Sequence, residues 1–215
     1  MKTKLYIVRH TQTTGNLECR LTGRKDYEIS EDGKKYIDKL TNRLKDINFD
    51  VAFSSTSGRA VKTIEPLAKL KKLEITKLDE LCEMYFGIYD GWKWEDVNKV
   101  NPAIRQTQID INEIAGIPEQ ETTEELQERI YNAINKIVQE NQGKTILIAS
   151  HGVAIEAFIR KITNKKFCED RQENSQKNTS VNIITYDSET KKYELELLND
   201  LSHLKERGYN ENKER

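Results

Sequence analysis

Cysteine is scarce in this chain. The 215 residues include three, Cys19, Cys82 and Cys168, and no two of them form a Cys-x-x-Cys pair. An odd number of widely separated thiols argues against the disulfide framework of a small secreted domain, and the spacing argues against a thiolate zinc site. We therefore expect a cytoplasmic protein.

Long apolar runs and an excess of charge of either sign are also absent. No stretch reaches the roughly 18 apolar residues that a membrane span needs, and the N-terminal LYIV segment is too short for a signal peptide. Lysine plus arginine (35) nearly balance aspartate plus glutamate (36), for a net charge of -1. We expect a soluble protein that binds neither membrane nor nucleic acid, so any anion site must be a local cluster.

Short apolar runs alternate with helical patterns along the chain. The runs at 5–8 (LYIV), 51–53 (VAF) and 145–149 (TILIA) indicate buried parallel strands, and 73–78, 181–186 and 193–198 indicate three further strands. Helices are expected at 30–46, 58–70, 122–143 and 153–162, whereas 84–120 has no strong period. The pattern predicts an α/β fold, a three-layer sandwich with a mostly parallel central sheet between helices. We expect a single domain at 1–205 and a polar tail at 206–215.

Polar and charged residues follow each of the first three strands. Arg9 and His10 end the first, Ser54-Ser55 and then Arg59 follow the second, and His151 follows the third. A lone histidine at a strand end is usually a turn residue or a hydrogen-bonded core group, and an arginine there can simply mark the exit into water. The carboxyl ends of parallel strands meet in one crevice, however, so we expect these four side chains to converge.

Two kinds of ligand compete for such a crevice. His10, His151 and a carboxylate could bind zinc. Arg9 and Arg59 would repel a cation and attract an anion, and guanidinium groups match phosphate oxygens with paired hydrogen bonds. The residues therefore favour a phosphoryl group, with neither metal nor cofactor.

A phosphoryl site of this kind needs a nucleophile and a proton donor. A neutral imidazole is a competent nucleophile, and an arginine neighbour keeps it unprotonated by lowering its pKa, so either His10 or His151 could serve. A carboxyl group could protonate the leaving oxygen and then activate water. Spacing alone does not choose among Glu80, Glu83 and Asp90 for this role.

Several longer motifs occur in order over nearly the whole chain: Arg9-His10-Thr11 with Thr14 and Asn16, Thr22-Gly23, Ile29-Ser30-x-x-Gly33, Ser54-Ser55-x-x-x-Arg59-Ala60-x-x-Thr63, Leu81-x-Glu83-x-x-Phe86-Gly87-x-x-Asp90-Gly91, Glu121-Thr122, Ser150-His151-Gly152 and Ser202-His203-Leu204. Together they resemble the histidine phosphatase superfamily, which includes the cofactor-dependent phosphoglycerate mutases, and look closest to its small bacterial phosphatases. One departure is Glu119-Gln120, where the family often has Gly-Gly.

The resemblance implies a phosphoglycerate mutase-like fold and a role for each matched residue. It implies that His10 is the nucleophile and that Glu83 is the proton donor. It also implies phosphoryl binding by Arg9, Arg59 and His151, and substrate binding by Asn16, Thr22, Gly23 and Gly152.

We therefore predict a metal-independent phosphomonoester hydrolase that acts on a small phosphorylated metabolite through a phosphohistidine. A phosphoglycerate mutase is an alternative, but that branch carries a longer, basic and Tyr-rich insertion after its acid/base motif. The equivalent segment here, 92–118, is short, with acidic residues at 95, 96, 110 and 113 against basic ones at 93, 99 and 105. A catalytically silent phosphate-binding module is a second alternative, although no reacting residue is missing.

Other features of the sequence leave their roles undecided. Tyr85, Phe86, Trp92 and Trp94 could pack an apolar leaving group or close a small core, and His203 is not expected to be catalytic. Neither the identity of the substrate nor the oligomeric state follows from the sequence, and a homo-oligomer stays open.

Overall fold

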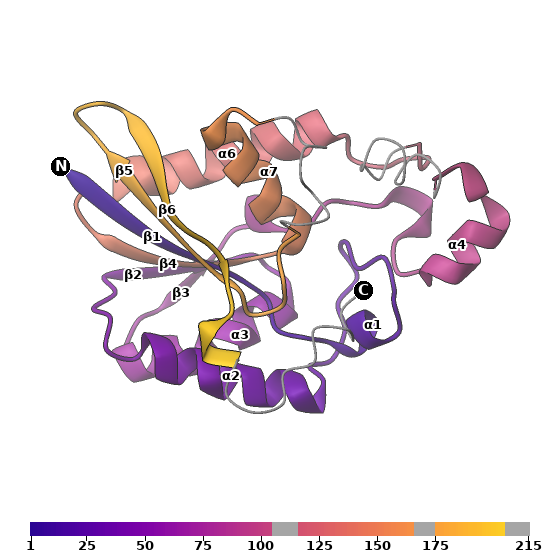
Figure 1. Cartoon of the computed structure of the whole chain (residues 1–215), viewed down its shortest axis with the longest axis horizontal. Helices are drawn as coiled ribbons and strands as arrows, with labels where there is room; N and C mark the ends of the chain where they lie inside the picture. Colours follow the sequence, from indigo (N-terminus) through magenta and orange to yellow (C-terminus); the bar gives the residue numbers. More distant parts are fainter. Residues whose placement is uncertain (105–115, 166–174, 205–215) are drawn as a thin grey trace.

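A six-stranded sheet with the strand order β3-β2-β4-β1-β5-β6 forms the centre of the molecule (Figure 1). The computed structural model describes residues 1–104, 116–165 and 175–204. The strands are β1 (Lys2–Arg9), β2 (Val51–Ser54), β3 (Ile75–Lys77), β4 (Thr145–Ser150), β5 (Val181–Asp187) and β6 (Lys192–Asp200). Strands β3, β2, β4 and β1 are parallel, and β5 is antiparallel to both of its neighbours. The predicted, mostly parallel sheet is confirmed.

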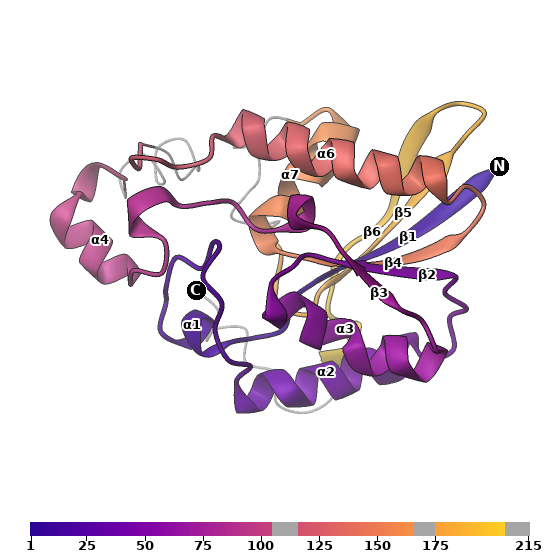
Figure 2. The ribbon, with the colours of Figure 1, turned by 180° about the vertical axis from the view of Figure 1, so that it is seen from behind.

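Helices cover both faces of the sheet. Figures 1 and 2 show α2 and α3 on one side and α6 and α7 on the other, which confirms the three-layer sandwich. The α-helices are α1 (Thr14–Leu17), α2 (Glu31–Leu44), α3 (Gly58–Lys71), α4 (Trp94–Val100), α6 (Thr123–Glu140) and α7 (Gly152–Thr163). Short 3₁₀ helices are η1 (Asp79–Leu81), η2 (Gly87–Tyr89) and η3 (Ser202–Leu204).

The side chains of β1 alternate between the two helical layers. Leu5 and Ile7 belong to the apolar cluster that includes the buried faces of α6 and α7. Tyr6 and Val8 belong to the cluster on the side of α2 and α3. Because both faces of the sheet are covered, the central strands are continuous apolar runs rather than alternating ones.

The helix starts that the sequence predicts are confirmed by their capping bonds. Ser30 Oγ accepts from the backbone N–H of Gly33 at 3.0 Å, at the start of α2. At the start of α6, Thr122 Oγ1 accepts from Glu125 N at 3.2 Å, and Glu125 Oε2 accepts from Thr122 N at 2.8 Å. This reciprocal pair is a capping box.

Several predicted boundaries are wrong by a few residues, and two of them have a clear physical reason. Helix α6 ends at Glu140 rather than at Gly143, because Asn141 leaves the helical conformation and its Nδ2 donates to the carbonyl of Ile137 at 2.9 Å. Strand β3 does not begin at 73, because Leu73 N donates to Ala68 O at 2.9 Å and so still closes the end of α3.

The segment 84–120, which has no strong period in the sequence, contains η2 and α4, and its residues 105–115 lie outside the described part of the chain. Within it, Glu119 has φ 63°, a left-handed conformation that favours glycine. The predicted tail at 206–215 also lies outside the described residues. No helix in the described ranges has the length and apolar character needed to span a membrane.

Candidate active site

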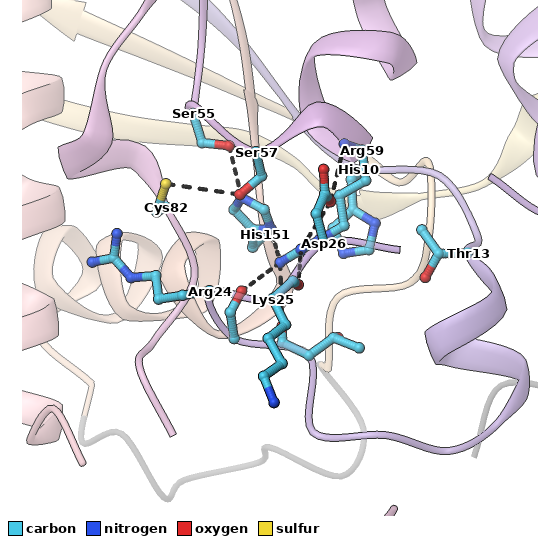
Figure 3. A network of polar contacts seen from close by, with 12 residues as sticks. His10, Thr13, Arg24, Lys25, Asp26, Ser55, Ser57, Arg59, Cys82 and His151 are labelled. Carbon is cyan, nitrogen blue, oxygen red and sulfur yellow. Dashed lines mark hydrogen bonds and ion pairs between the residues drawn. The ribbon is translucent and has the colours of Figure 1, made fainter. Parts of the chain in front are cut away.

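The carboxyl ends of β1, β2 and β4 converge, as the sequence predicts. The ring centroids of His10 and His151 lie 5.2 Å apart, and Arg59 Nη2 lies 3.0 Å from His151 Nδ1 (Figure 3). His10 N donates to Ser150 O at 2.9 Å, which joins the end of β1 to the end of β4. Arg59 comes from the first turn of α3, just after β2. All three site side chains are buried.

The partners of His10 determine which ring nitrogen carries its proton. Nδ1 lies 2.7 Å from the backbone carbonyl oxygen of Thr11. A carbonyl oxygen can only accept, so Nδ1–H is the donor and the neutral ring has its lone pair on Nε2. That nitrogen is the one available to attack an electrophile.

His151 has the opposite tautomer. Its Nδ1 faces Arg59 Nη2, which can only donate, so Nδ1 is the acceptor. The proton of the neutral ring is then on Nε2, which donates to Ser55 Oγ at 2.8 Å. The two imidazoles are therefore held in different protonation patterns by their neighbours.

Both imidazoles are kept neutral by their surroundings. Burial, and then the charges of Arg59 and Arg9, hold the pKa of His10 well below its usual range. Burial and the charge of Arg59 also lower the pKa of His151, with smaller contributions from His10, Arg9 and Arg24. The arginines that favour binding of an anion thus also favour the unprotonated form of both histidines. Burial lowers the two pKa values more than the arginines do.

Arg59 bonds to the protein through both of its terminal nitrogens. Its acceptors are Thr22 O (3.2 Å), Gly23 O (2.7 Å), Lys25 O (2.7 Å), Asp26 Oδ1 (3.2 Å) and His151 Nδ1. Its Nε atom is buried without a hydrogen-bond partner among the described residues. Arg59 therefore does not have two terminal nitrogens available for a pair of hydrogen bonds to phosphate. Its Nε–H is the donor that is available to an anion.

Asp90 fixes the other side of the loop that contains Thr22 and Gly23. One carboxylate oxygen accepts from Gly23 N at 2.8 Å, and the other accepts from Arg24 N at 2.8 Å and from Lys25 N at 3.3 Å. Asp90, a candidate proton donor in the sequence, is thus the anchor of this loop. A Cβ atom on Gly23 would lie 2.6 Å from Met84 O, so the loop packs too closely for a larger residue.

Glu83 lies at the amino end of α7. Oε1 accepts from Ala154 N and Met84 N, both at 3.0 Å, and Oε2 accepts from Val153 N at 3.1 Å. The carboxyl group is buried, and these backbone donors fix its position. Of the three carboxylates considered from the sequence, Glu83 is the one bonded to the helix that follows His151.

Arg9 and Gly152 are in contact at the same helix end. A Cβ atom on Gly152 would lie 3.3 Å from Arg9 Nε and 3.4 Å from Arg9 Cζ, so the small residue leaves room for the guanidinium group. Arg9 Nη1 donates to the backbone carbonyl of Gln176. The structure thus places all the predicted phosphate-binding side chains around the ends of β1, β4 and α3.

Asn16 and Asn178 connect α1 to His10. Asn178 Nδ2 donates to His10 O at 2.9 Å and lies 3.4 Å from Asn16 Oδ1, which also accepts from Thr13 N at 3.0 Å. Because its oxygen has these donors, the Nδ2 amide of Asn16 is the group that it can offer to a phosphate. Within the described residues, no three His, Cys, Asp or Glu side chains are grouped so that they could hold a metal ion.

Sequence reasoning missed Ser55, Asn178 and Gln176 as parts of the site. Ser55 stands in a recognised motif but has no role until its bond to His151 is known. The signal for the other two was a buried polar segment directly before an apolar strand, 176–180 before β5. Because β5 runs antiparallel to β1, its amino end lies beside the carboxyl end of β1, and the rule for parallel strands does not cover it.

Comparisons with known proteins agree on one family. The family model described as the histidine phosphatase superfamily (branch 1) matches residues 5–201. Phosphoglycerate mutase-like protein 4 of Arabidopsis thaliana is 27% identical over 96% of this chain and 89% of its own length. The uncharacterized phosphatase PhoE of Bacillus subtilis (strain 168) is 29% identical over 75% of this chain and 78% of its own length. The solved structure of YhfR from Bacillus stearothermophilus is similar with a TM-score of 0.88 and 26% identity, over 94% of this chain and 99% of that one.

Proposed function

Because the chain belongs to branch 1 of the histidine phosphatase superfamily, we propose that it hydrolyses small phosphomonoesters through a phosphohistidine at His10. The observation that carries the proposal is the state of His10. Its ring is buried, its proton is held on Nδ1 by Thr11 O, and its Nε2 lone pair is available beside two arginines. A neutral, oriented imidazole next to fixed positive charge is suited to attack on phosphorus.

The proposed reaction has two steps, phosphoryl transfer to His10 and hydrolysis of the phosphohistidine. His10 Nε2 attacks the phosphorus, and the bond from phosphorus to the leaving oxygen breaks as Glu83 gives that oxygen a proton. The Glu83 carboxylate then takes a proton from water, whose oxygen attacks the phosphorus and breaks the bond to Nε2. Free phosphate leaves, and His10 and Glu83 return to their starting states.

Positive charge around His10 stabilises the transferring group. Arg59, through its Nε–H, and Arg9 face the negative charge of the phosphoryl oxygens in both steps. In this proposal the two guanidinium groups supply the electrostatic stabilisation, so no step requires a metal ion.

A mutase is the second candidate, since the Arabidopsis relative is named phosphoglycerate mutase-like. A mutase returns the phosphoryl group to a second hydroxyl before water arrives, and the basic insertion of that branch holds the doubly phosphorylated intermediate. In α4, the corresponding part of this chain, Lys99 is paired with Asp96 at 3.2 Å and Glu95 at 3.8 Å. This neutralised helix favours hydrolysis.

The proposal is tested by trapping the intermediate with ³²P-labelled phosphomonoesters and by assaying free phosphate beside phosphoglycerate isomerisation. We expect an acid-labile, alkali-stable phosphoenzyme and release of phosphate, both unchanged by EDTA. His10→Ala should abolish both, whereas His203→Gln, at the third histidine, should abolish neither.

Three results would each overturn the proposal in a recognisable way. Absence of any phosphoenzyme in the wild type, together with binding of phosphate esters, would indicate a silent module. Isomerisation without net phosphate release would indicate a mutase, and activity lost to EDTA and restored by zinc would indicate a metal enzyme.

A further inference from the structure

Arg24 lies in the loop 22–25, and hydrogen bonds hold the main chain of this loop in place. Its backbone N–H bonds to Asp90 Oδ2 at 2.8 Å, and the flanking carbonyls of Gly23 and Lys25 each accept from Arg59 at 2.7 Å. The side chain therefore starts from a fixed point next to the phosphate-binding guanidinium.

The side chain of Arg24 forms an ion pair that is open to water. Nη1 lies 3.0 Å from Asp79 Oδ2, and the Arg24 and Asp79 side chains are 31% and 69% exposed. Figure 3 shows Arg24 leaving the loop on the side of Cys82, while Lys25 extends in a different direction. An ion pair that water reaches so freely contributes little stability, so another anion can replace Asp79 at low cost.

Asp79 brings the Arg24 guanidinium close to the proposed chemistry. Its Oδ1 accepts from Thr56 Oγ1 at 3.0 Å and lies 3.5 Å from Cys82 Sγ. Thr56 is the residue after Ser55, which bonds to His151, and Cys82 is the residue before Glu83. The pair is thus bonded to the chain neighbours of Ser55 and of Glu83, the group proposed to protonate the leaving oxygen. The Arg24 charge is near enough to contribute to the lowered pKa of His151.

Two other arginines around the site bond largely to internal groups. Arg59 holds the carbonyls of the loop, and Arg129 bonds to the half-buried Glu121 at 2.7 Å and to the carbonyl of Cys82 at 3.1 Å. The side chain of Lys25 lies against Gly91, because a Cβ atom added to Gly91 would be 2.4 Å from Lys25 Cδ. Arg24 differs from the other two arginines in degree: its carboxylate partner is 69% exposed, whereas those of Arg59 and Arg129 are 42% and 13% exposed.

We propose that Arg24 determines specificity by binding a second anionic group, such as a carboxylate, on the leaving-group side of the substrate. The inference rests on the proposed hydrolysis, because it concerns the alcohol part of the ester. On binding, the guanidinium exchanges Asp79 for the substrate anion, and a carboxylate matches its planar donors with two parallel hydrogen bonds. The preferred substrates are then phosphate esters of hydroxy acids rather than of neutral alcohols.

The test compares two esters that differ in this group alone. D-3-Phosphoglycerate carries a carboxylate where sn-glycerol 1-phosphate, which has the same arrangement at C2, carries a hydroxymethyl group. Both are titrated calorimetrically into a His10→Ala background, so that affinity is measured without turnover, and kcat/KM for phosphate release is measured in the His10 enzyme. We expect tighter binding of 3-phosphoglycerate. Arg24→Ala should weaken the binding of 3-phosphoglycerate by about tenfold and change the binding of sn-glycerol 1-phosphate by less than about twofold.

Two further variants separate a specific contact from general charge. Asp79→Asn removes the carboxylate of the protein that competes for Arg24, so it should strengthen 3-phosphoglycerate binding and leave the binding of sn-glycerol 1-phosphate unchanged. Lys25→Ala removes one positive charge from the same loop and should alter the preference little. Equal binding of the two esters by the His10→Ala protein, equal losses for both in Arg24→Ala, or weaker 3-phosphoglycerate binding in Asp79→Asn would overturn the inference.

The two proposals fail in different measurements. A wild type without phosphoenzyme but with Arg24-dependent binding of the carboxylate ester would contradict the hydrolase and support the Arg24 site. A phosphoenzyme that forms equally well from both esters, with no effect of Arg24→Ala, would support the hydrolase and contradict the Arg24 site.

Discussion

At the scale of single residues, the two imidazoles differ in which nitrogen is free. Thr11 O holds the proton of His10 on Nδ1, and Arg59 holds that of His151 on Nε2. The nitrogen with the open lone pair is Nε2 in His10, whereas in His151 the lone pair is already bonded. The residue types alone left the choice of nucleophile open, and it is the neighbouring donors and acceptors that distinguish the two rings.

Ser55 offers a direct test of how much the orientation of His151 matters. Ser55→Ala removes the acceptor of His151 Nε2–H, and we expect kcat to fall by about three- to tenfold, the equivalent of one neutral hydrogen bond. Ser54→Ala is the matched control, because Ser54 Oγ is equally buried and has no hydrogen-bond partner in the described part of the chain. Steady-state kinetics of the two variants check the prediction, and equal effects would contradict it.

At the scale of elements, the loop 22–25 is held between α3 and the segment after η2. Arg59 bonds to its carbonyl groups on one side, and Asp90 bonds to its N–H groups on the other. The loop is therefore positioned by main-chain bonds, which leaves its side chains available for other contacts.

For this loop we predict that Asp90→Ala weakens substrate binding more than it slows the chemical step. Three backbone donors lose their acceptor, so we expect KM to rise by about tenfold or more with a smaller change in kcat, and the melting temperature to fall. Asp96→Ala removes a carboxylate that pairs with Lys99 on the exposed part of α4, and it should have little effect on either. A drop in kcat alone for Asp90→Ala would argue against a positioning role.

Element order and most strand ends could be predicted from the sequence, and the reason is physical. Buried parallel strands need apolar side chains on both faces, and their carboxyl ends must meet, so His10, Arg59 and His151 were found together. The partners of these residues could not be predicted, because they are backbone carbonyls and a polar segment before an antiparallel strand. The anchor role of Asp90 depends on a contact between residues 66 or 67 positions apart, which no local pattern encodes.

At the scale of the whole molecule, the histidines make the fold sensitive to acid. Burial and the charge of Arg43 lower the pKa of His203 to about 4 from 6.5, and the pKa values of His10 and His151 are lowered as well. The unfolded chain therefore binds more protons than the folded one below about pH 6.5, and stability must fall as the pH decreases from there toward 4.

The corresponding prediction concerns His203, which lies outside the proposed site. Its Nδ1 lies 3.0 Å from Arg43 Nη1, so a second ring proton would face a group that can only donate. We expect His203→Gln to reduce the loss of unfolding free energy between about pH 7 and pH 5, measured by urea denaturation, because one titrating group is removed. A slope as steep as that of the wild type would contradict this account.

Glu83 has one role that the structure shows and one that we propose. Its carboxylate is the acceptor for the first amides of α7, and it is also the group proposed to release and regain a proton. A charged carboxylate accepts N–H bonds more strongly than a neutral carboxylic acid. In the proposed catalytic cycle, the attachment of α7 at its amino end would therefore alternate between a stronger and a weaker form, in step with the formation and loss of the phosphorylated enzyme.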